Sequence, residues 1–250
     1  MSAPLTPSNE EERAVVNTEA PEATPSRRYR ITFATTGPLA YVSVLELGTV
    51  WERSLRRAGI VLRYSQGFNP RPKIQFASPL PTGCGGAAEW LDIWLESPKE
   101  PAQIAAALEG KTPDALSVLD VTSVPESEPP LSEQLVATET LVLLQDANLK
   151  AVQTAIAELL GSASILRPRR GKQRGKPYDL RPLVESLTAE AAASPWSVSL
   201  SMRLTARPGA TGRPDEVLDA LGLADKPQRC TRTRLILGHP DERNHGIDEK

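Results

Sequence analysis

The feature that most constrains the fold of this chain is a switch in hydrophobic period that occurs twice in the same order. Apolar residues alternate with polar ones where a strand buries one face, and they recur every three or four residues where a helix does so. In the first half, these periods predict strands at 29–34, 60–64, 88–95 and 116–124, with helices at 43–59 and 101–108. The order β-α-β-β-α-β is that of a ferredoxin-like unit.

The helix that begins at Ser43 has the clearest local signals. Ser43 and Glu46 have the spacing of a capping box, and Gly59 provides a C-terminal stop. Between them an apolar stripe runs through Leu47, Val50, Trp51, Leu55 and Ala58. The pattern predicts a helix with one buried face.

The second half repeats this order of elements. Strands are predicted at 138–144, 163–166, 196–205 and 228–237, with helices after Asp146 and at Pro214. The predicted fold class is therefore α+β, with two tandem ferredoxin-like (β-α-β-β-α-β) halves and a disordered N-terminal tail. We expect the halves to span 27–124 and 138–238, joined by a linker at 125–137 that contains PESEPP.

The two ends of the chain differ in composition from these halves. Residues 1–26 are rich in Pro, Glu, Ala, Ser and Thr, so they bury too little apolar surface to offset the entropy of ordering. We expect a disordered tail at 1–26 and a second tail at 239–250, which holds both histidines, His239 and His245. A catalytic or metal-binding histidine is therefore not expected.

Charge is segregated along the chain, although the formal net charge is only −2. Residues 27–75 carry nine cations and two acids, and residues 161–182 carry seven cations and one acid, whereas residues 76–160 carry three cations and thirteen acids. Two basic islands in an acidic chain indicate contact with a polyanion at particular places. The alternative is that these cations offset acids across the fold.

Cysteine content and hydropathy indicate the compartment. Cysteine occurs only at Cys84 and Cys230, so a disulfide framework or zinc site is not expected, although pairing of the two stays open. No apolar run approaches the ~18 residues needed to cross a bilayer, and we recognise no secretory leader. We expect a soluble, cytoplasmic protein without a membrane partner, metal or cofactor.

The segment RYSQGFNPRPKIQFASPLPTG, residues 63–83, begins within the first basic island and runs beyond it. Its four prolines fix the backbone, so the segment loses less entropy on binding than an ordinary loop. Aromatic rings stack on bases and cations reach phosphates, which makes this segment a candidate platform for single-stranded RNA. The candidate RNA-binding residues are Arg63, Tyr64, Gly67, Phe68, Asn69, Arg71 and Lys73. The alternative is a structural crossover whose aromatics fill the core.

The second basic island, LRPRRGKQRGKPYDLR at 166–181, has no amphipathic period, and its glycines and prolines prevent a helix. We interpret it as a flexible basic arm, with a solvated charged loop as the alternative. Its candidate RNA-binding residues are Arg167, Arg169, Arg170, Lys172, Arg174, Lys176 and Arg181. Both islands follow the predicted second strand of their half, so we expect them to flank one groove.

No catalytic constellation is apparent. The chain has no HExxH, no nucleophile elbow and no P-loop in a strand-to-helix context. Asp92 and Asp179 are lone acids, and a single carboxylate without a spaced partner carries little information. Trp90 and Trp94 either stack on bases or pack against the other half, and we prefer the second reading.

The segment YSQGFNPRPKIQFASPLPTG, preceded by TGPLAYVS and ERSLRRAGI and followed by AEWLDIWL, resembles the radical-SAM-linked family of bacterial proteins. The similarity covers Arg28 to about Leu237 and includes KPYDLRPLVESL. It implies association with radical S-adenosylmethionine proteins, to which the domain is often fused, and gene neighbourhoods with an RNA-processing ribonuclease and ribosomal proteins. The cluster-binding CxxxCxxC is absent from this sequence, so the chain is not itself the radical enzyme.

These observations favour an RNA-binding accessory protein in RNA modification or processing, with the chemistry done by a separate radical SAM enzyme or ribonuclease. Two alternatives stay open. One is a stand-alone RNA enzyme, related by fold analogy to repeat-RNA endonucleases or pseudouridine synthases. The other is a protein-interaction scaffold whose basic loops bind an acidic partner.

Overall fold

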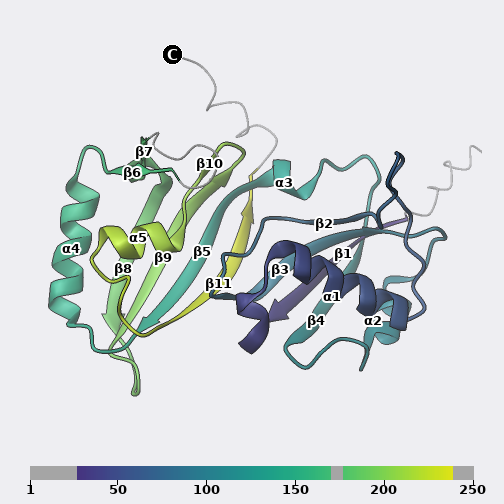
Figure 1. Cartoon of the computed structure of the whole chain (residues 1–250), viewed down its shortest axis with the longest axis horizontal. Helices are drawn as coiled ribbons and strands as arrows, with labels where there is room; N and C mark the ends of the chain where they lie inside the picture. Colours follow the sequence, from purple (N-terminus) through teal and green to yellow (C-terminus); the bar gives the residue numbers. More distant parts are fainter. Residues whose placement is uncertain (1–26, 170–176, 239–250) are drawn as a thin grey trace, which may run out of the picture.

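The computed structural model describes residues 27–169 and 177–238, which form a mixed α+β structure around one large, mostly antiparallel sheet (Figure 1). The main path of this sheet runs β10-β9-β5-β11-β3-β1-β4, with β2 paired to β3 and β8 paired to β9. Its strands are β1 (Arg28–Thr35), β2 (Ile74–Phe76), β3 (Cys84–Trp94), β4 (Leu116–Val124), β5 (Leu135–Leu144), β8 (Val184–Ala191), β9 (Val198–Arg207), β10 (Ala210–Thr211) and β11 (Gln228–Leu237). A separate small sheet pairs β6 (Leu166–Pro168) with β7 (Pro177–Asp179).

The helices are short and lie between these strands. They are η1 (Gly37–Tyr41), α1 (Val44–Arg57), α2 (Pro101–Leu108), α3 (Leu131–Gln134), α4 (Leu149–Gly161), η3 (Arg181–Leu183) and α5 (Pro214–Ala220). The tails predicted at 1–26 and 239–250 lie outside the described residues. No helix among the described residues is long and apolar enough to span a membrane.

Helix α1 confirms the local prediction in detail. The Ser43 hydroxyl accepts a hydrogen bond from the Glu46 N–H (3.3 Å), and the Glu46 carboxylate accepts one from the Ser43 N–H (2.7 Å). The bond from the Ser43 N–H holds the pKa of the Glu46 carboxyl below its usual value. Trp51 and Leu55 are fully buried, and Gly59 follows the helix with φ +68°. The capping box and apolar stripe therefore place this helix as the sequence indicates.

Each half of the sheet has its own hydrophobic core. In the first half, Ile31 and Phe33 of β1 and Leu91 of β3 pack with Trp51 of α1 and Ile104 of α2. In the second half, a larger cluster joins β5, β8 and β9 to α4 and α5, with members such as Val142, Leu187, Leu200, Ile156 and Val217. A smaller cluster joins Ala77 and Trp90 of the first half to residues of the linker and the second half, Leu131, Leu135, Ala206, Leu235 and Leu237.

The two halves share one sheet because β11 runs parallel to β3. Only three residue pairs make this junction, from Cys230↔Cys84 to Arg232↔Gly86. Cys84 and Cys230 form a disulfide, the pairing that the sequence left open, and this bond removes one premise of the expected cytoplasmic location.

A buried ion pair lies beside the disulfide. The Arg232 guanidinium binds both carboxylate oxygens of Glu89, with Nε 2.8 Å from Oε1, and both side chains are about 95% buried. Arg232 also donates to the carbonyls of Ser78 (3.1 Å) and Pro79 (3.2 Å). All three guanidinium nitrogens of Arg232 are thereby engaged, so the ion pair holds residues 78–79 over the junction.

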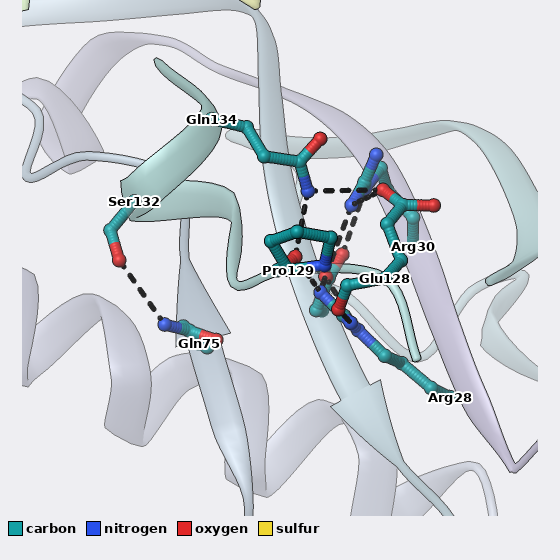
Figure 2. A network of polar contacts seen from close by, with 8 residues as sticks. Arg28, Arg30, Gln75, Glu128, Pro129, Ser132 and Gln134 are labelled. Atoms are coloured by element: carbon teal, nitrogen blue, oxygen red, sulfur yellow. Dashed lines mark hydrogen bonds and ion pairs between the residues drawn. The ribbon is translucent and has the colours of Figure 1, made fainter. Parts of the chain in front are cut away.

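Part of the predicted linker is an ordered strap over the first half (Figure 2). The Asp92 carboxylate is fully buried and accepts hydrogen bonds from Arg28 (2.6 Å) and Arg30 (2.9 Å). Arg28 also donates to the carbonyls of Glu128 and Pro129, and the Glu128 carboxylate accepts from Arg30 (3.0 Å). Glu128 of PESEPP therefore binds an arginine of β1, as the alternative reading of the charge blocks allows.

The predicted second strand of each half is wrong in position. Residues 60–64 make only isolated bridges, Leu62 to Leu95 and Tyr64 to Pro72, and β2 pairs with β3 at the position expected for them. In the second half, residues 166–168 form β6, which pairs with β7, and β8 pairs with β9 at the position expected for the second strand. A register shift between Val184 and Ser186 puts Val184 and Leu187 on the buried side although they are three residues apart. This irregularity hides the alternation of β8 in the sequence.

Candidate nucleic-acid interface

Residues 63–73 form an ordered hairpin, which we call the finger. Its base is held by backbone hydrogen bonds from Arg63 N–H to the Trp94 carbonyl (2.7 Å) and from Lys73 N–H to the Arg63 carbonyl (2.7 Å). Closer to the tip, Ser65 N–H donates to the Arg71 carbonyl (2.8 Å), and the Ser65 hydroxyl accepts from Arg71 N–H (3.0 Å). The tip turns at Gly67, whose φ of +143° disfavours other residues.

The finger presents aromatic rings to solvent. Phe68 is completely exposed (104%), and Tyr64 is 55% exposed. By contrast, Phe76, just beyond the finger, packs edge-on against Phe33 with ring centroids 6.2 Å apart. The crossover reading, in which the aromatics of this segment fill the core, therefore holds for Phe76 but not for Tyr64 or Phe68. Burial of a Phe side chain stabilises a protein by about 1.5–3 kcal/mol. The fold of the described residues does not obtain this stabilisation from Phe68, because the ring is exposed.

The cations of the finger are accessible too. Arg71 is exposed, and its guanidinium has no ion pair within 27–169 or 177–238. Arg63 lies 3.6 Å from Glu126, with both side chains more than 40% exposed, and such surface pairs contribute little. The Lys73 ammonium sits 4.1 Å from the centroid of the Trp94 ring, and Asn69 is exposed at the tip. Two exposed rings thus lie on the same short hairpin as three cations.

In the second basic island, by contrast, two of the candidate arginines bind other parts of the chain. Arg167 binds Glu216 (3.2 Å) and Asp219, and Arg181 donates to the carbonyls of Leu160 (3.1 Å) and Val184 (3.0 Å). Arg169 is exposed, with its guanidinium carbon 5.4 Å from the centroid of the Tyr178 ring. The other candidates, Arg170, Lys172, Arg174 and Lys176, lie outside the described residues. Arg167 and Arg181 therefore serve the fold.

The described residues of the second basic island lie far from the finger, so for these residues the expectation that the two islands flank one groove is wrong. The finger is anchored at the Trp94 end of β3, whereas the second half joins β3 at the Cys84 end. At about 3.3 Å per residue, the 11 residues of β3 separate these ends by roughly 33 Å. Figure 1 shows β6 and β7 at the left end of the molecule and the dark blue finger, between α1 and β2, at the right.

The lone acids considered from the sequence are structural. Asp92 is sealed between Arg28 and Arg30. The Asp179 carboxylate accepts from the backbone N–H groups of Ile165 (2.7 Å) and Arg181 (3.0 Å), and the Ile165 bond leads the effects that lower its pKa. Neither carboxylate is placed as a catalytic acid or base.

The aromatic side chains of β3 and β7 are at least partly buried. Trp90 packs at the boundary between the halves, as the preferred reading expects, whereas Trp94 is buried within the first half under Arg28 and Lys73. Burial raises the pKa of the Tyr178 hydroxyl, and the charge of Glu216 raises it further. Within the described ranges, no group of three or more His, Cys, Asp or Glu side chains is arranged to hold a metal ion.

Comparisons with known proteins place the chain in a family. Residues 28–214 match DUF2344, described as an uncharacterized protein conserved in bacteria. The chain belongs to this family. No curated protein matches the DUF2344 chain.

Among solved structures, the chain is similar to one chain of a Cbf5-Nop10-Gar1 complex, with a TM-score of 0.45 and 13% sequence identity. The match covers 83% of the DUF2344 chain and 48% of the other, so the chain spans about half the length of that structural neighbour.

Proposed function

We propose that this DUF2344 protein is an RNA-binding accessory protein and that the finger is its contact with single-stranded RNA. The observation that carries the proposal is the full exposure of Phe68 at the tip of an ordered hairpin, with Tyr64 and Arg71 exposed beside it. Stacking of a base on an aromatic ring contributes about 1–3 kcal/mol, and cations on the same hairpin neutralise adjacent phosphates. Because the hairpin is already ordered, little conformational entropy is lost on binding.

The rest of the proposal concerns the fold and partners. The strand order β4-β1-β3-β2 in the first half and β11-β5-β9-β8 in the second supports a duplicated ferredoxin-like unit over 27–124 and 138–238. The family resemblance supports a radical SAM protein or a ribonuclease as the enzyme that acts on the bound RNA. A cytoplasmic location goes with such a partner.

The test is fluorescence anisotropy of a labelled single-stranded RNA with the full chain and its variants. Phe68→Ala and Tyr64→Ala should each weaken binding by about fivefold or more, because each removes a stacking ring. Arg71→Gln should weaken binding and flatten its salt dependence. If the three finger cations neutralise phosphates, log K should fall with log salt at a slope of about −2, from ~0.7 per contact.

Leu119→Ala is the matched control, since Leu119 is a large apolar side chain, 53% exposed, on β4. All variants should unfold at the wild-type temperature. Equal binding of RNA by Phe68→Ala and wild type would overturn the proposal. Preference for polyglutamate over RNA would favour a scaffold for an acidic protein, and cleavage or isomerisation of the RNA by the pure chain would favour an enzyme.

A further inference from the structure

The face of the sheet that carries α1 and α5 has a cleft between the two halves, which we call the inter-half cleft. It consists of two adjoining hollows of about 500 Å³ and 260 Å³ that share Pro81, Thr82 and Pro214 in their linings. Residues 78–83 and the start of α1 form one wall, and residues 211–215 form the other. Figure 1 shows α1 and α5 on this face with β11 between them. The cleft therefore belongs to neither half alone.

The lining of the inter-half cleft is rich in hydroxyl groups. Six line the larger hollow: Ser43, Ser78, Thr82, Thr138, Thr140 and Thr211. Thr138 and Thr140 alternate along β5, so both lie on the face that Val142 buries further along the strand. A hydroxyl both donates and accepts hydrogen bonds, so this lining suits a polar ligand whose edges carry both kinds of group.

One of these hydroxyls has no partner. Thr140 is 2% exposed, and its Oγ1 makes no hydrogen bond to any part of the chain that the structure describes. A buried polar atom left without a partner costs about 1–3 kcal/mol, and nearly all such atoms in native proteins are satisfied. Valine has the same shape and avoids this cost, so the hydroxyl at this position calls for a partner that the chain does not supply.

The cleft also has a ring and a cation. The Tyr41 ring is 72% exposed at the smaller hollow. The Arg213 side chain is 51% exposed on the wall of the larger hollow and binds Asp215 at 3.1 Å, a surface pair that a phosphate can replace. Arg232 and Glu89 neutralise each other, so they offer no free charge to a ligand.

A path leads from the second basic island into the cleft. Arg213 and Thr211 also line a third hollow, of about 640 Å³, together with Arg169 and Tyr178. The three hollows thus adjoin through shared residues, from the exposed guanidinium of Arg169 to the ring of Tyr41. Cations at one end and a ring at the other match the order of phosphate and base in a nucleotide.

We propose that the inter-half cleft is a binding site for a single ribonucleotide. Tyr41 stacks on the base, the hydroxyls of β5 bond its polar edge, and Arg213 binds the phosphate. The larger hollow is in the range of small-ligand sites. The Cys84 end of the cleft lies roughly 30 Å from the base of the finger, at the other end of β3, and free nucleotide is the probe, so the proposal does not depend on the proposed function.

The test is titration of the full chain with uridine and adenosine 5′-monophosphate, up to about 10 mM, followed by amide NMR shifts. Shifts at residues of the cleft are expected, with a dissociation constant at or below ~1 mM. Tyr41→Ala should weaken binding about fivefold or more, through loss of stacking. Arg213→Gln should weaken binding of the monophosphates but not of the free nucleosides.

Thr140→Val is the decisive variant because it separates a ligand-binding role from a structural one. Removing an unpartnered buried hydroxyl should leave stability unchanged or raised, so a merely structural Thr140 predicts wild-type nucleotide affinity. The proposal predicts affinity that is about fivefold lower in a protein at least as stable. Leu119→Ala, at an exposed apolar position of β4 outside both the cleft and the finger, is the control and should bind nucleotides normally.

Three outcomes would overturn the proposal. They are the absence of cleft shifts at the highest nucleotide concentration, wild-type affinity in both Tyr41→Ala and Thr140→Val, and shifts of the same pattern with inorganic phosphate alone. The last result identifies an anion site that does not recognise a nucleotide. Loss of oligonucleotide binding in Phe68→Ala, with these nucleotide shifts intact, would show the two sites to be separate.

Discussion

Among single residues, Asp92 shows that the role of a carboxylate depends on its buried partners and not on its local sequence. In the sequence it is one acid in a strand with two tryptophans, and nothing local distinguishes it from a catalytic carboxylate. Its partners Arg28 and Arg30 are 64 and 62 positions away, so the sequence pattern alone does not reveal them. The exposure of Phe68 is also hidden in the sequence. The ring stays out of the core because the hairpin that carries it is closed by hydrogen bonds between residues on its two sides.

Asp92→Asn tests the role of the buried carboxylate. The substitution leaves two guanidinium groups around a neutral amide, and breaking a buried ion pair from one side typically costs about 3–5 kcal/mol. We expect a loss of this size in the free energy of unfolding, measured by urea denaturation. Asp120→Asn, at an exposed carboxylate of β4, is the matched control and should stay within about 0.5 kcal/mol of wild type. Similar stabilities of the two variants would contradict a buried ion-pair network.

The elements divide into those fixed by local signals and those fixed by distant contacts. Helix α1 is predicted in position, cap and buried face, because its capping box and stripe are determined within 17 residues, from Ser43 to Gly59. Strands β2 and β8 are missed or misplaced. β2 is only three residues long, and β8 is interrupted by a register shift, so their pairing with β3 and β9 determines them more than their own pattern does.

Ser43→Ala tests the N-terminal cap of α1. Loss of an N-cap hydroxyl costs about 1 kcal/mol, because the N–H of Glu46 loses its partner. We expect a drop of this order in the unfolding free energy at pH 7, measured by chemical denaturation. Thr49→Ala, at an exposed position inside the same helix, is the control and should have a smaller effect. An equal loss in the two variants would argue against the cap.

The pH dependence of the cap follows from the carboxyl of Glu46. Its pKa is lowered in the folded protein by the bond from the Ser43 N–H, so the ionised form favours folding. The stabilisation is complete above the ordinary value of 4.5 and is lost as the pH falls through the lowered folded value. The stability difference between wild type and Glu46→Gln should therefore be larger at pH 7 than at about pH 3, by thermal unfolding. A difference that is constant with pH would show that the carboxylate charge plays no part.

The whole molecule depends on one junction that the sequence does not reveal. The repeated pattern predicts two halves and a linker, whereas the structure joins the halves through three residue pairs and an ordered strap. The paired cysteines are 146 residues apart, so no spacing rule connects them. The same junction creates the inter-half cleft, whose lining comes from both halves, so the residue pattern within either half alone does not reveal it.

Reduction of the Cys84–Cys230 disulfide tests this junction. A cross-link over 146 residues restricts the unfolded chain strongly, and closing long loops stabilises proteins by about 2–5 kcal/mol. Dithiothreitol should lower the unfolding free energy of the wild type by this amount and leave a Cys84→Ala/Cys230→Ala double variant unaffected. Because β3 and β11 share so few hydrogen bonds, reduction should also speed amide exchange at the junction before that of either core. Alkylation of both cysteines in the unreduced native protein, seen by mass spectrometry, would show that the halves are held by hydrogen bonds and the Arg232–Glu89 pair alone.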